Sequence, residues 1–290
     1  LYVPGDTTAR SVGADAVAAA IAAEAARRGI AIDLVRNGSR GLMWLEPLVE
    51  VATPAGRIAY GPVTAADVPG LFNAGFLDGK PHPLSHGLTE AIPFLRRQER
   101  LTFARVGIVD PLSLDDYAAH GGLTGLKAAL ALTPGDIVQA ITDSGLRGRG
   151  GAAFPAGIKW RTVRDAPGTE KTIVCNADEG DSGTFSDRML LEGDPYCLIE
   201  GMIIAGLAVG ATKGYVYLRS EYPLAWRIVH QALDRARAAG LLGDDLLGSG
   251  KAFDIEARLG AGAYICGEET ALLESLEGKK GMPRMKPPFP

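Results

Sequence analysis

The chain has 290 residues, 47% of them hydrophobic, so it is long enough for a full core and for two domains. Its formal net charge is −4 and it has no lysine- or arginine-rich run, which argues against nucleic-acid binding, because phosphate backbones require a basic surface. Its three cysteines, Cys175, Cys197 and Cys266, form no C-x-x-C pair. This spacing argues against a disulfide framework or a zinc site and predicts no metal site in this chain. It suits a reducing cytoplasm, which is the predicted location.

The two ends and the most apolar run carry no membrane signal. The first residues lack the basic region of a signal peptide, and the run MIIAGLAVGA from Met202 is about half as long as a membrane span. We therefore expect a buried helix there and no transmembrane segment. The final MPRMKPPFP offers no closing helix, which leads us to expect a fragment truncated at its C-terminus.

Residues 1–95 have the pattern of one domain. We expect a strand over 1–4, a helix over 13–28, a strand over 30–35, a hairpin that turns at 54–56, and a helix that follows Thr64 as its N-cap. This β-α-β-β-β-α order is that of a thioredoxin-like unit. Such units elsewhere use cysteines for redox chemistry or iron–sulfur binding, and this segment has none. We therefore predict a scaffold or docking domain.

Residues 96–132 form a predicted connecting segment, and 133–290 form a second domain in which helices alternate with strands. Thr133 as N-cap, Pro134 at the first helical position and Gly145 as the stop predict the first helix. The alternation predicts an α/β fold. The further expected helices lie within 158–166, 194–211, 223–240 and 266–278, and the expected strands begin at 171, 213 and 253.

The loop SGLRGRGGAAFPAG, residues 144–157, concentrates glycine where the backbone must approach something closely. Gly148, Gly150 and Ala153 match a loose G-x-G-x-x-A dinucleotide fingerprint, but a helix rather than a strand enters the loop, so an ordinary Rossmann site is excluded. The remaining interpretations are a cradle for a phosphate or a flat ring, and a structural turn between two helices.

Two further stretches carry candidate ligand groups. The acidic loop CNADEGDSGTFSDR, from Cys175, can recognise sugar hydroxyls and ring N–H groups or can simply be solvated, and it lacks the spacing of a calcium loop. In GAGAYICGEETALLESLEG, Glu268 and Glu269 fall in a first helical turn, where the helix dipole alone explains carboxylates. The final KPPFP holds a cation and an aromatic side chain on a rigid segment, as a linker between domains also can.

Together these blocks resemble the flavin-bearing, 51 kDa-type subunit of respiratory complex I and the related subunits of NAD-reducing hydrogenases and NAD-dependent molybdenum formate dehydrogenases. They occur in the order of that family over residues 144–290. The segments VRNGSRGLMWLEPLVEV and AYGPVTAADVPGLF most resemble the formate dehydrogenase β subunit. The resemblance implies an atypical, Rossmann-like FMN-binding domain at 133–290 behind a thioredoxin-like domain without cluster cysteines.

The resemblance also assigns site residues. It implies that Glu179 and Glu269 line the nicotinamide end and form the catalytic pair. The implied FMN-binding residues are Gly148, Arg149, Gly150, Gly151, Lys159, Asn176, Asp178, Glu179, Tyr264, Gly267, Glu268 and Glu269. The implied NAD-binding residues are Phe154, Lys159, Glu179, Glu269, Lys286 and Phe289.

The implied function is hydride transfer between NAD(H) and FMN, with electrons relayed to or from iron–sulfur clusters. The 4Fe–4S ligands expected of a full-length family member are absent from this chain. Implied partners are a 2Fe–2S thioredoxin-like small subunit and a molybdenum-containing large subunit. The alternatives are a diaphorase subunit of a hydrogenase or of complex I and, in another class, a non-catalytic assembly module.

Overall fold

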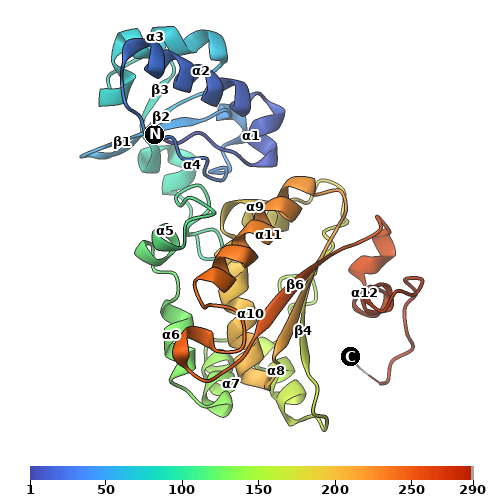
Figure 1. Ribbon diagram of the computed structural model, residues 1–290. Coiled ribbons are helices and arrows are strands. Elements are labelled where there is room, and N and C mark those ends of the chain that lie inside the picture. Colours follow the sequence, from blue (N-terminus) through green and yellow to red (C-terminus); the bar gives the residue numbers. More distant parts are fainter. Residues whose placement is uncertain (289–290) are drawn as a thin grey trace. The chain divides into compact units, whose positions relative to one another are not determined.

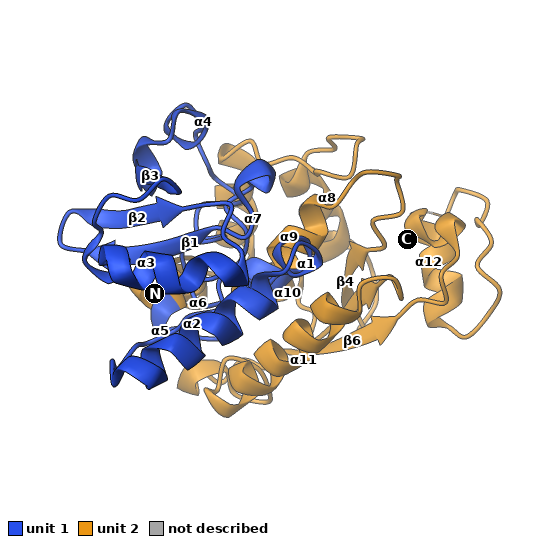
Figure 2. Ribbon diagram, turned by 90° about the horizontal axis from the view of Figure 1, so that it is seen from above, with its two compact units in different colours: residues 1–116, 192–194 blue, residues 117–191, 195–290 orange. Residues whose placement is uncertain are grey.

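A computed structural model describes residues 1–288 of the chain and divides them into two compact units (Figure 2). Unit 1 comprises Leu1–Asp116 together with Glu192–Asp194, and unit 2 comprises the remaining described residues. The predicted division into 1–95, 96–132 and 133–290 remains a prediction.

Unit 1 is built on an antiparallel sheet in the order β1-β2-β3. The predicted hairpin is present: Val49 pairs with Tyr60 and Thr53 with Gly56, so the chain turns at Pro54 and Ala55. The third strand, which the sequence analysis did not predict, joins β2 through a register shift next to Tyr60. The strands are β1 (Val49–Thr53), β2 (Gly56–Tyr60) and β3 (Ser85–Leu88).

The two other strands expected in unit 1 are shorter than predicted. Residues 1–4 and 30–35 are extended, but each pairs only at an isolated bridge, Tyr2 with both Val35 and Glu50. The Tyr2 amide donates to the Glu50 carbonyl at 2.8 Å, and the Val3 amide donates to the Val35 carbonyl at 3.0 Å. Helix α1 begins at Thr7 with Asp6 as its N-cap, which ends the N-terminal segment before it could continue as a strand. The thioredoxin-like arrangement stays a prediction.

The helices of unit 1 begin and end where capping chemistry places them. Helix α2 ends at Gly29, which has φ 68° and so adopts the left-handed conformation that favours glycine. Thr64 and Asp67 form a capping box ahead of α3. The α-helices that begin in unit 1 are α1 (Thr7–Ser11), α2 (Ala14–Arg28), α3 (Val68–Ala74), α4 (Pro93–Arg96) and α5 (Leu114–Ala119).

Unit 2 is built on a parallel sheet in the order β4-β5-β6 (Figure 1). The register aligns Ala177, Leu218 and Leu259, so the carboxyl ends of all three strands lie at one edge. Loops that follow these strands therefore converge in space although they are far apart in sequence. The strands are β4 (Thr172–Ala177), β5 (Lys213–Leu218) and β6 (Asp254–Leu259).

Helices pack against both faces of this sheet, but one face stays partly exposed and carries ion pairs of Lys213 with Asp254 and Glu256. Helices α10 and α11 pack on one face (Figure 1), and on the other Val174 and Tyr217 pack with α12 residues Leu272 and Leu276. The face under α10 and α11 is buried because the crossover helices that connect parallel strands lie on it. The helices of unit 2 are α6 (Thr124–Leu130), α7 (Pro134–Asp143), α8 (Ala156–Asp165), α9 (Ser186–Gly193, with its last two residues in unit 1), α10 (Pro195–Val209), α11 (Pro223–Ala238) and α12 (Glu269–Leu276).

This combination of helices with a parallel sheet confirms the predicted α/β class. Thr133 accepts a hydrogen bond from the Asp136 amide, which confirms it as the N-cap of α7. Within residues 1–288, none of the helices has both the length and the apolar character needed to cross a bilayer.

A group of charged side chains is buried in unit 1. Arg40 and Glu50 are almost fully buried, with 3.4 Å between Nε and Oε1, and Arg57 approaches the same carboxylate at 3.7 Å. Arg40 also pairs with Glu90. Removal of one partner from such a group is costly, because it leaves a buried charge uncompensated.

The buried carboxyl of Glu46 makes the stability of unit 1 depend on pH. It accepts hydrogen bonds from Ser39 Oγ at 2.7 Å and from the Leu48 amide at 3.0 Å. Burial, reinforced by the neighbouring carboxylates of Asp6 and Glu50, raises the pKa of Glu46 to about 7. A carboxyl whose folded-state pKa is raised binds its proton more tightly in the folded protein, so stability falls as pH rises towards 7 and then levels off.

We predict that Glu46→Gln removes this loss. The variant should gain stability relative to the unchanged protein between about pH 5 and about pH 8, by up to roughly 3 kcal/mol. Urea unfolding followed by circular dichroism at several pH values measures the difference. The exposed Glu99→Gln is the matched control, and an equal pH dependence of the protein with and without Glu46→Gln would contradict the prediction.

Candidate functional site

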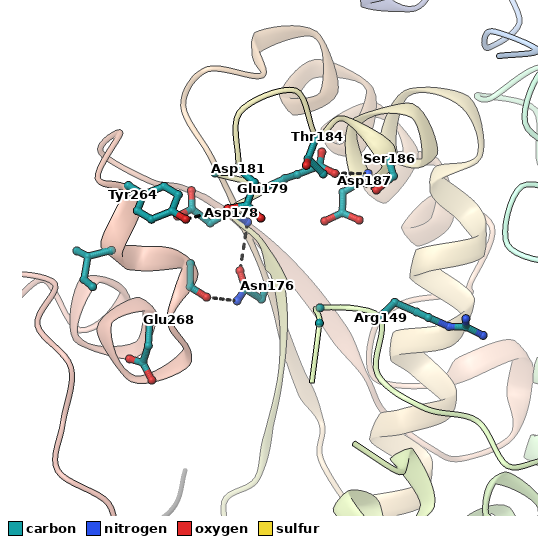
Figure 3. A pocket seen from close by; sticks show the side chains of 15 residues that line it. Arg149, Asn176, Asp178, Glu179, Asp181, Thr184, Ser186, Asp187, Tyr264 and Glu268 are labelled. Carbon is teal, nitrogen blue, oxygen red and sulfur yellow. Dashed lines mark hydrogen bonds between the residues drawn. The ribbon is translucent and has the colours of Figure 1, made fainter. Parts of the chain in front are cut away.

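A cavity of about 680 Å³ lies in unit 2, at the carboxyl ends of β4 and β6 (Figure 3). This edge is where open parallel sheets bind ligands. Three segments line it: the glycine loop before α8, the acidic loop after β4, and the turn before α12. The lining residues are Arg149, Gly150, Gly151, Asn176, Asp178, Glu179, Gly180, Asp181, Thr184, Ser186, Asp187, Tyr264, Ile265, Gly267 and Glu268.

The glycine loop is closed at its base by backbone hydrogen bonds. The Gly148 amide donates to the Phe154 carbonyl at 2.8 Å, and the Ala156 amide donates to the Leu146 carbonyl at 2.9 Å. Gly151 has φ 107°, in the region that favours glycine, whereas Ala153 has φ 51° and carries a Cβ there. A non-glycine residue in this conformation stores about 1–2 kcal/mol of strain, which the closed loop must offset.

The loop presents bare backbone to the cavity. A Cβ atom built on Gly150 or Gly151 meets no other atom within 4 Å, so the space beside both residues is open. A side chain would therefore occupy the room that a ligand needs. In Figure 3 the Arg149 side chain points away from Asn176 and Tyr264, so the wall here is main chain rather than guanidinium.

Glu179 fixes the acidic loop. Its buried carboxylate accepts four hydrogen bonds: from Ser186 Oγ at 3.0 Å, from the Asp187 and Arg188 amides at 2.9 and 3.2 Å, and from the Tyr222 hydroxyl at 3.0 Å. The two amides belong to the N-terminus of α9, where a carboxylate is stabilised by unpaired N–H groups. The loop is therefore closed back onto α9 by a single side chain.

Three side chains near Glu179 interact with its carboxylate or its backbone carbonyl. Burial, reinforced by this carboxylate, raises the pKa of Tyr222 to about 12, so the hydroxyl keeps its proton and donates. Burial followed by the charge of Glu179 also raises the pKa of Asp187. The Arg219 guanidinium donates to the Glu179 carbonyl oxygen, which ties the same loop to the segment after β5.

Asp178 carries the unsatisfied group of the site. Its Oδ2 atom is buried and has no hydrogen-bond partner among residues 1–288. Burial raises the pKa of Asp178, although Arg219 opposes the shift. Buried carboxylate oxygens are normally paired, so this atom indicates a donor supplied from outside the chain.

Asn176 and Tyr264 join the acidic loop to the turn before α12. Asn176 Nδ2 donates to the Gly267 carbonyl at 2.8 Å, and its Oδ1 accepts from the Asp178 amide at 3.2 Å. The Tyr264 hydroxyl donates to Asp181 Oδ1 at 2.8 Å (Figure 3). This bond raises the pKa of Tyr264.

Gly180 permits this closure. A Cβ atom at Gly180 would lie 2.8 Å from the Tyr264 ring, closer than real Cβ contacts. A larger residue there would push the ring away from the loop and break its bond to Asp181.

The glutamates before and within α12 have different tasks. Glu268 Oε2 caps the helix by accepting from the Thr270 and Ala271 amides, both at 2.9 Å. With the Thr270 hydroxyl as the largest cause, these bonds hold the pKa of Glu268 at about 2. Lys286 Nζ donates to Oε1 of both glutamates, at 3.0 Å for Glu268 and 2.5 Å for Glu269. Lys159 Nζ lies 4.0 Å from the other oxygen of Glu269.

The structure thus places most of the predicted FMN-binding residues around one cavity. Lys159, Glu269 and Lys286 do not line it, but their ion cluster includes Glu268, which does and which also pairs with Lys286. Gly148 acts at the base of the glycine loop. Phe154 is 54% exposed and also lies outside the lining. The predicted Phe289 lies outside the described residues. The roles assigned to all these residues remain predictions.

Several lining residues were not assigned from the sequence. All but Ile265 belong to the acidic loop and the first turn of α9. Ser186-Asp187 is a recognisable helix start, so the sequence could have shown that the acidic loop ends there. Gly180, directly before Asp181, was the other sequence feature that could have marked this part of the site. The unassigned residues are Gly180, Asp181, Thr184, Ser186, Asp187 and Ile265.

Comparison with known protein families matches residues 141–290 to the Nuo51 FMN-binding domain. The chain belongs to this family. The predicted 51 kDa-type resemblance is therefore confirmed, and so is FMN as the cofactor of the family's domain. The match to this domain does not specify a formate dehydrogenase subunit.

Individual relatives give the same picture over part of their length. The chain is 53% identical over 195 residues to NADP-reducing hydrogenase subunit HndC of Solidesulfovibrio fructosivorans, covering 67% of this chain and 40% of that protein. It is 51% identical over 178 residues to an NADH-quinone oxidoreductase subunit of Aquifex aeolicus, covering 61% and 42%. The crystal structure of an H2-reduced NAD+-reducing [NiFe]-hydrogenase matches with TM-score 0.56 and 30% identity, over 100% of this chain and 47% of that one. The chain thus spans about two fifths of these two curated relatives.

The residues present fit FMN. The open space beside Gly150 and Gly151 allows a flat ring to lie against the backbone. The unpaired Asp178 oxygen can accept a hydrogen bond from a ring N–H or a ribityl hydroxyl. Contacts among the described residues explain neither feature.

We predict that Gly150→Leu abolishes FMN binding without unfolding the protein. Gly150 does not need a positive φ and its Cβ would meet open space, so leucine should fold but fill the cavity. FMN released on denaturation measures occupancy, and circular dichroism checks the fold. The matched control is Gly201→Leu on the exposed surface of α10, where a Cβ also meets no atom within 4 Å. Normal FMN content in the Gly150 variant would refute the loop assignment.

We predict that Tyr222→Phe loosens the acidic loop. Loss of one of the four donors to Glu179 should cost about 1 kcal/mol and leave a buried carboxylate less satisfied. Amide hydrogen exchange over residues 180–187 should accelerate, and FMN should bind several-fold more weakly. Tyr215→Phe on β5 controls for loss of a tyrosine hydroxyl, and unchanged exchange in the Tyr222 variant would count against the role of this bond.

Proposed function

We propose that this chain is the NAD(H)- and FMN-binding part of a flavoprotein subunit that transfers hydride between the two cofactors and relays electrons to iron–sulfur centres of a multisubunit oxidoreductase. The observation that carries the proposal is the cavity at the carboxyl ends of the parallel strands. Its glycine wall and its unpaired Asp178 oxygen fit a flat, donor-bearing cofactor.

The nucleotide of the reaction is proposed from the named relatives. The matched hydrogenase structure is described as NAD+-reducing, and the Aquifex relative as an NADH-quinone oxidoreductase. The Solidesulfovibrio relative is named as NADP-reducing, so parallel assays with NADH and NADPH belong to the test. We propose NAD(H), in agreement with the sequence prediction.

The proposed work of the protein is positioning. Bound FMN supplies the capacity to exchange a hydride with nicotinamide and single electrons with iron–sulfur centres. The glycine loop forms one wall of the proposed cofactor site, and Asn176, Asp178 and Gly267 line another part of it. Closely stacked reactants and excluded water lower the barrier without a nucleophile or an acid–base pair.

The two glutamates predicted as catalytic receive different proposed roles. Glu179 acts as a positioning residue, because its carboxylate is engaged with α9 and Tyr222. Glu269 is nearly half exposed and is bonded to the flexible side chain of Lys286, so it can exchange this partner for the dinucleotide. We place Lys159, Lys286 and Phe154 on the proposed path of NAD(H).

For the whole enzyme we propose an NAD-dependent formate dehydrogenase of the cytoplasm, with a molybdenum-containing subunit and a 2Fe–2S subunit as partners. The support is the resemblance of the N-terminal segments to the formate dehydrogenase β subunit. A diaphorase subunit of an NAD-reducing hydrogenase is the alternative, favoured by the similarity to the hydrogenase structure over the whole chain.

The test is direct. Purified full-length protein should contain FMN, NADH should bleach its visible flavin band, and an artificial acceptor should be reduced. The copurified complex, assayed with formate and with hydrogen, distinguishes the two enzymes. A colourless protein that assembles normally would overturn the proposal in favour of a non-catalytic assembly module.

A further inference from the structure

Unit 1 exposes two aromatic side chains in edge-to-face contact. Trp44 is 57% and Phe94 39% exposed, with ring centroids 5.1 Å apart and ring planes at 89°. Their sequence neighbours Leu45 and Leu95 are buried in one apolar cluster together with Ile92. The rings therefore stand on a packed base, while their outer surfaces face solvent.

This arrangement has the properties of a binding anchor. The edge-to-face contact stabilises the pair, and each ring has only two rotatable side-chain bonds, so little entropy is lost when a partner covers them. Trp44 lies in the short 3-10 helix Met43–Leu45, and Phe94 follows Pro93 at the start of α4. Rigid exposed aromatics of this kind are enriched at protein interfaces.

Arginines accompany the aromatic pair. Arg96 and Arg97 are exposed two and three residues after Phe94, and Arg97 Nε donates to the Pro93 carbonyl at 3.0 Å. Arg100 follows on the same segment, and burial together with the charge of Arg40 lowers its pKa. Residues 90–100 thus carry three arginines against Glu90 and Glu99, and Glu90 pairs with the buried Arg40, so the segment has a small positive excess in a chain whose formal net charge is −4.

We propose that Trp44, Phe94, Arg96 and Arg97, hereafter the aromatic–arginine surface, dock an acidic segment of another subunit of the redox complex. Apolar side chains of that segment would cover the two rings, and its carboxylates would pair with the two guanidiniums. The identity of the partner as a redox subunit rests on the proposed function. The acidic character of the partner follows from the surface itself.

A second copy of this chain fits the surface less well. A two-fold interface brings the same patch against itself, so the arginines of both copies would lie close together. Like charges placed together across an interface oppose association. Nucleic acid is disfavoured by the net charge of the whole chain.

Photocrosslinking in the assembled complex identifies the occupant. Phe94 is replaced by the photoreactive amino acid p-benzoylphenylalanine in the full-length protein, which is coexpressed with its partner subunits, irradiated and analysed by mass spectrometry. We expect a crosslink to a net-negative segment of another subunit. Crosslinks to a second copy, to the protein's own chain or to a basic segment would overturn the proposal, as would none at all. Val12, 54% exposed in the same unit, is the control position.

Charge reversal tests the electrostatic part. The double variant Arg96→Glu/Arg97→Glu should bind the partner subunit at least about tenfold more weakly, with a smaller difference at high salt. Arg227→Glu on the exposed side of α11 is the control. Partner binding equal to that of the unchanged protein would refute the proposal.

The same variants separate this proposal from the function. Their FMN content and NADH-dependent acceptor reduction should be unchanged, because the aromatic–arginine surface and the cavity belong to different units. Absence of flavin from the unchanged protein would refute the proposed function and leave the crosslinking result standing. Loss of flavin only in the docking variants would refute the assignment of the surface to docking alone.

Discussion

The buried carboxylate of Glu179 is the contact on which the cavity depends. It lies between the end of β4 and the start of α9, and it satisfies donors from α9 and from Tyr222. Without it the α9 amides would lose their cap and the acidic loop would lose its closure. The wall of the proposed flavin site would then depend on the bonds of Asn176 and Tyr264 and on the Arg219 bond to the Glu179 backbone carbonyl.

The polar side chains of the site are largely engaged with one another. Asn176, Glu179 and Glu268 direct their polar atoms to backbone groups and neighbouring side chains. What remains for a cofactor is the glycine backbone, the buried oxygen of Asp178 and the ion cluster of Glu269. Such a shell is positioned before the ligand arrives, which reduces the ordering that binding must impose.

The two units differ in what they offer. Unit 2 carries the cavity and the family match, while unit 1 carries a buried charge cluster around Arg40 and Glu50 and the aromatic–arginine surface. The sequence analysis predicts a docking role for the N-terminal domain. The proposal for the aromatic–arginine surface assigns unit 1 the same role. In this view the first unit contributes assembly and the second contributes chemistry.

Local rules determined much from the sequence alone. The Thr133 cap, the end of the first long helix at Arg28, the hairpin at Pro54 and the helix–strand alternation depend on neighbouring residues, and each appears as predicted. The tertiary structure alone decided the rest, because it depends on contacts between distant segments. The reduced strands at 1–4 and 30–35 depend on what pairs with them. The closure of the acidic loop depends on Tyr222, a residue 43 positions from Glu179 in the chain. No sequence period records such a contact.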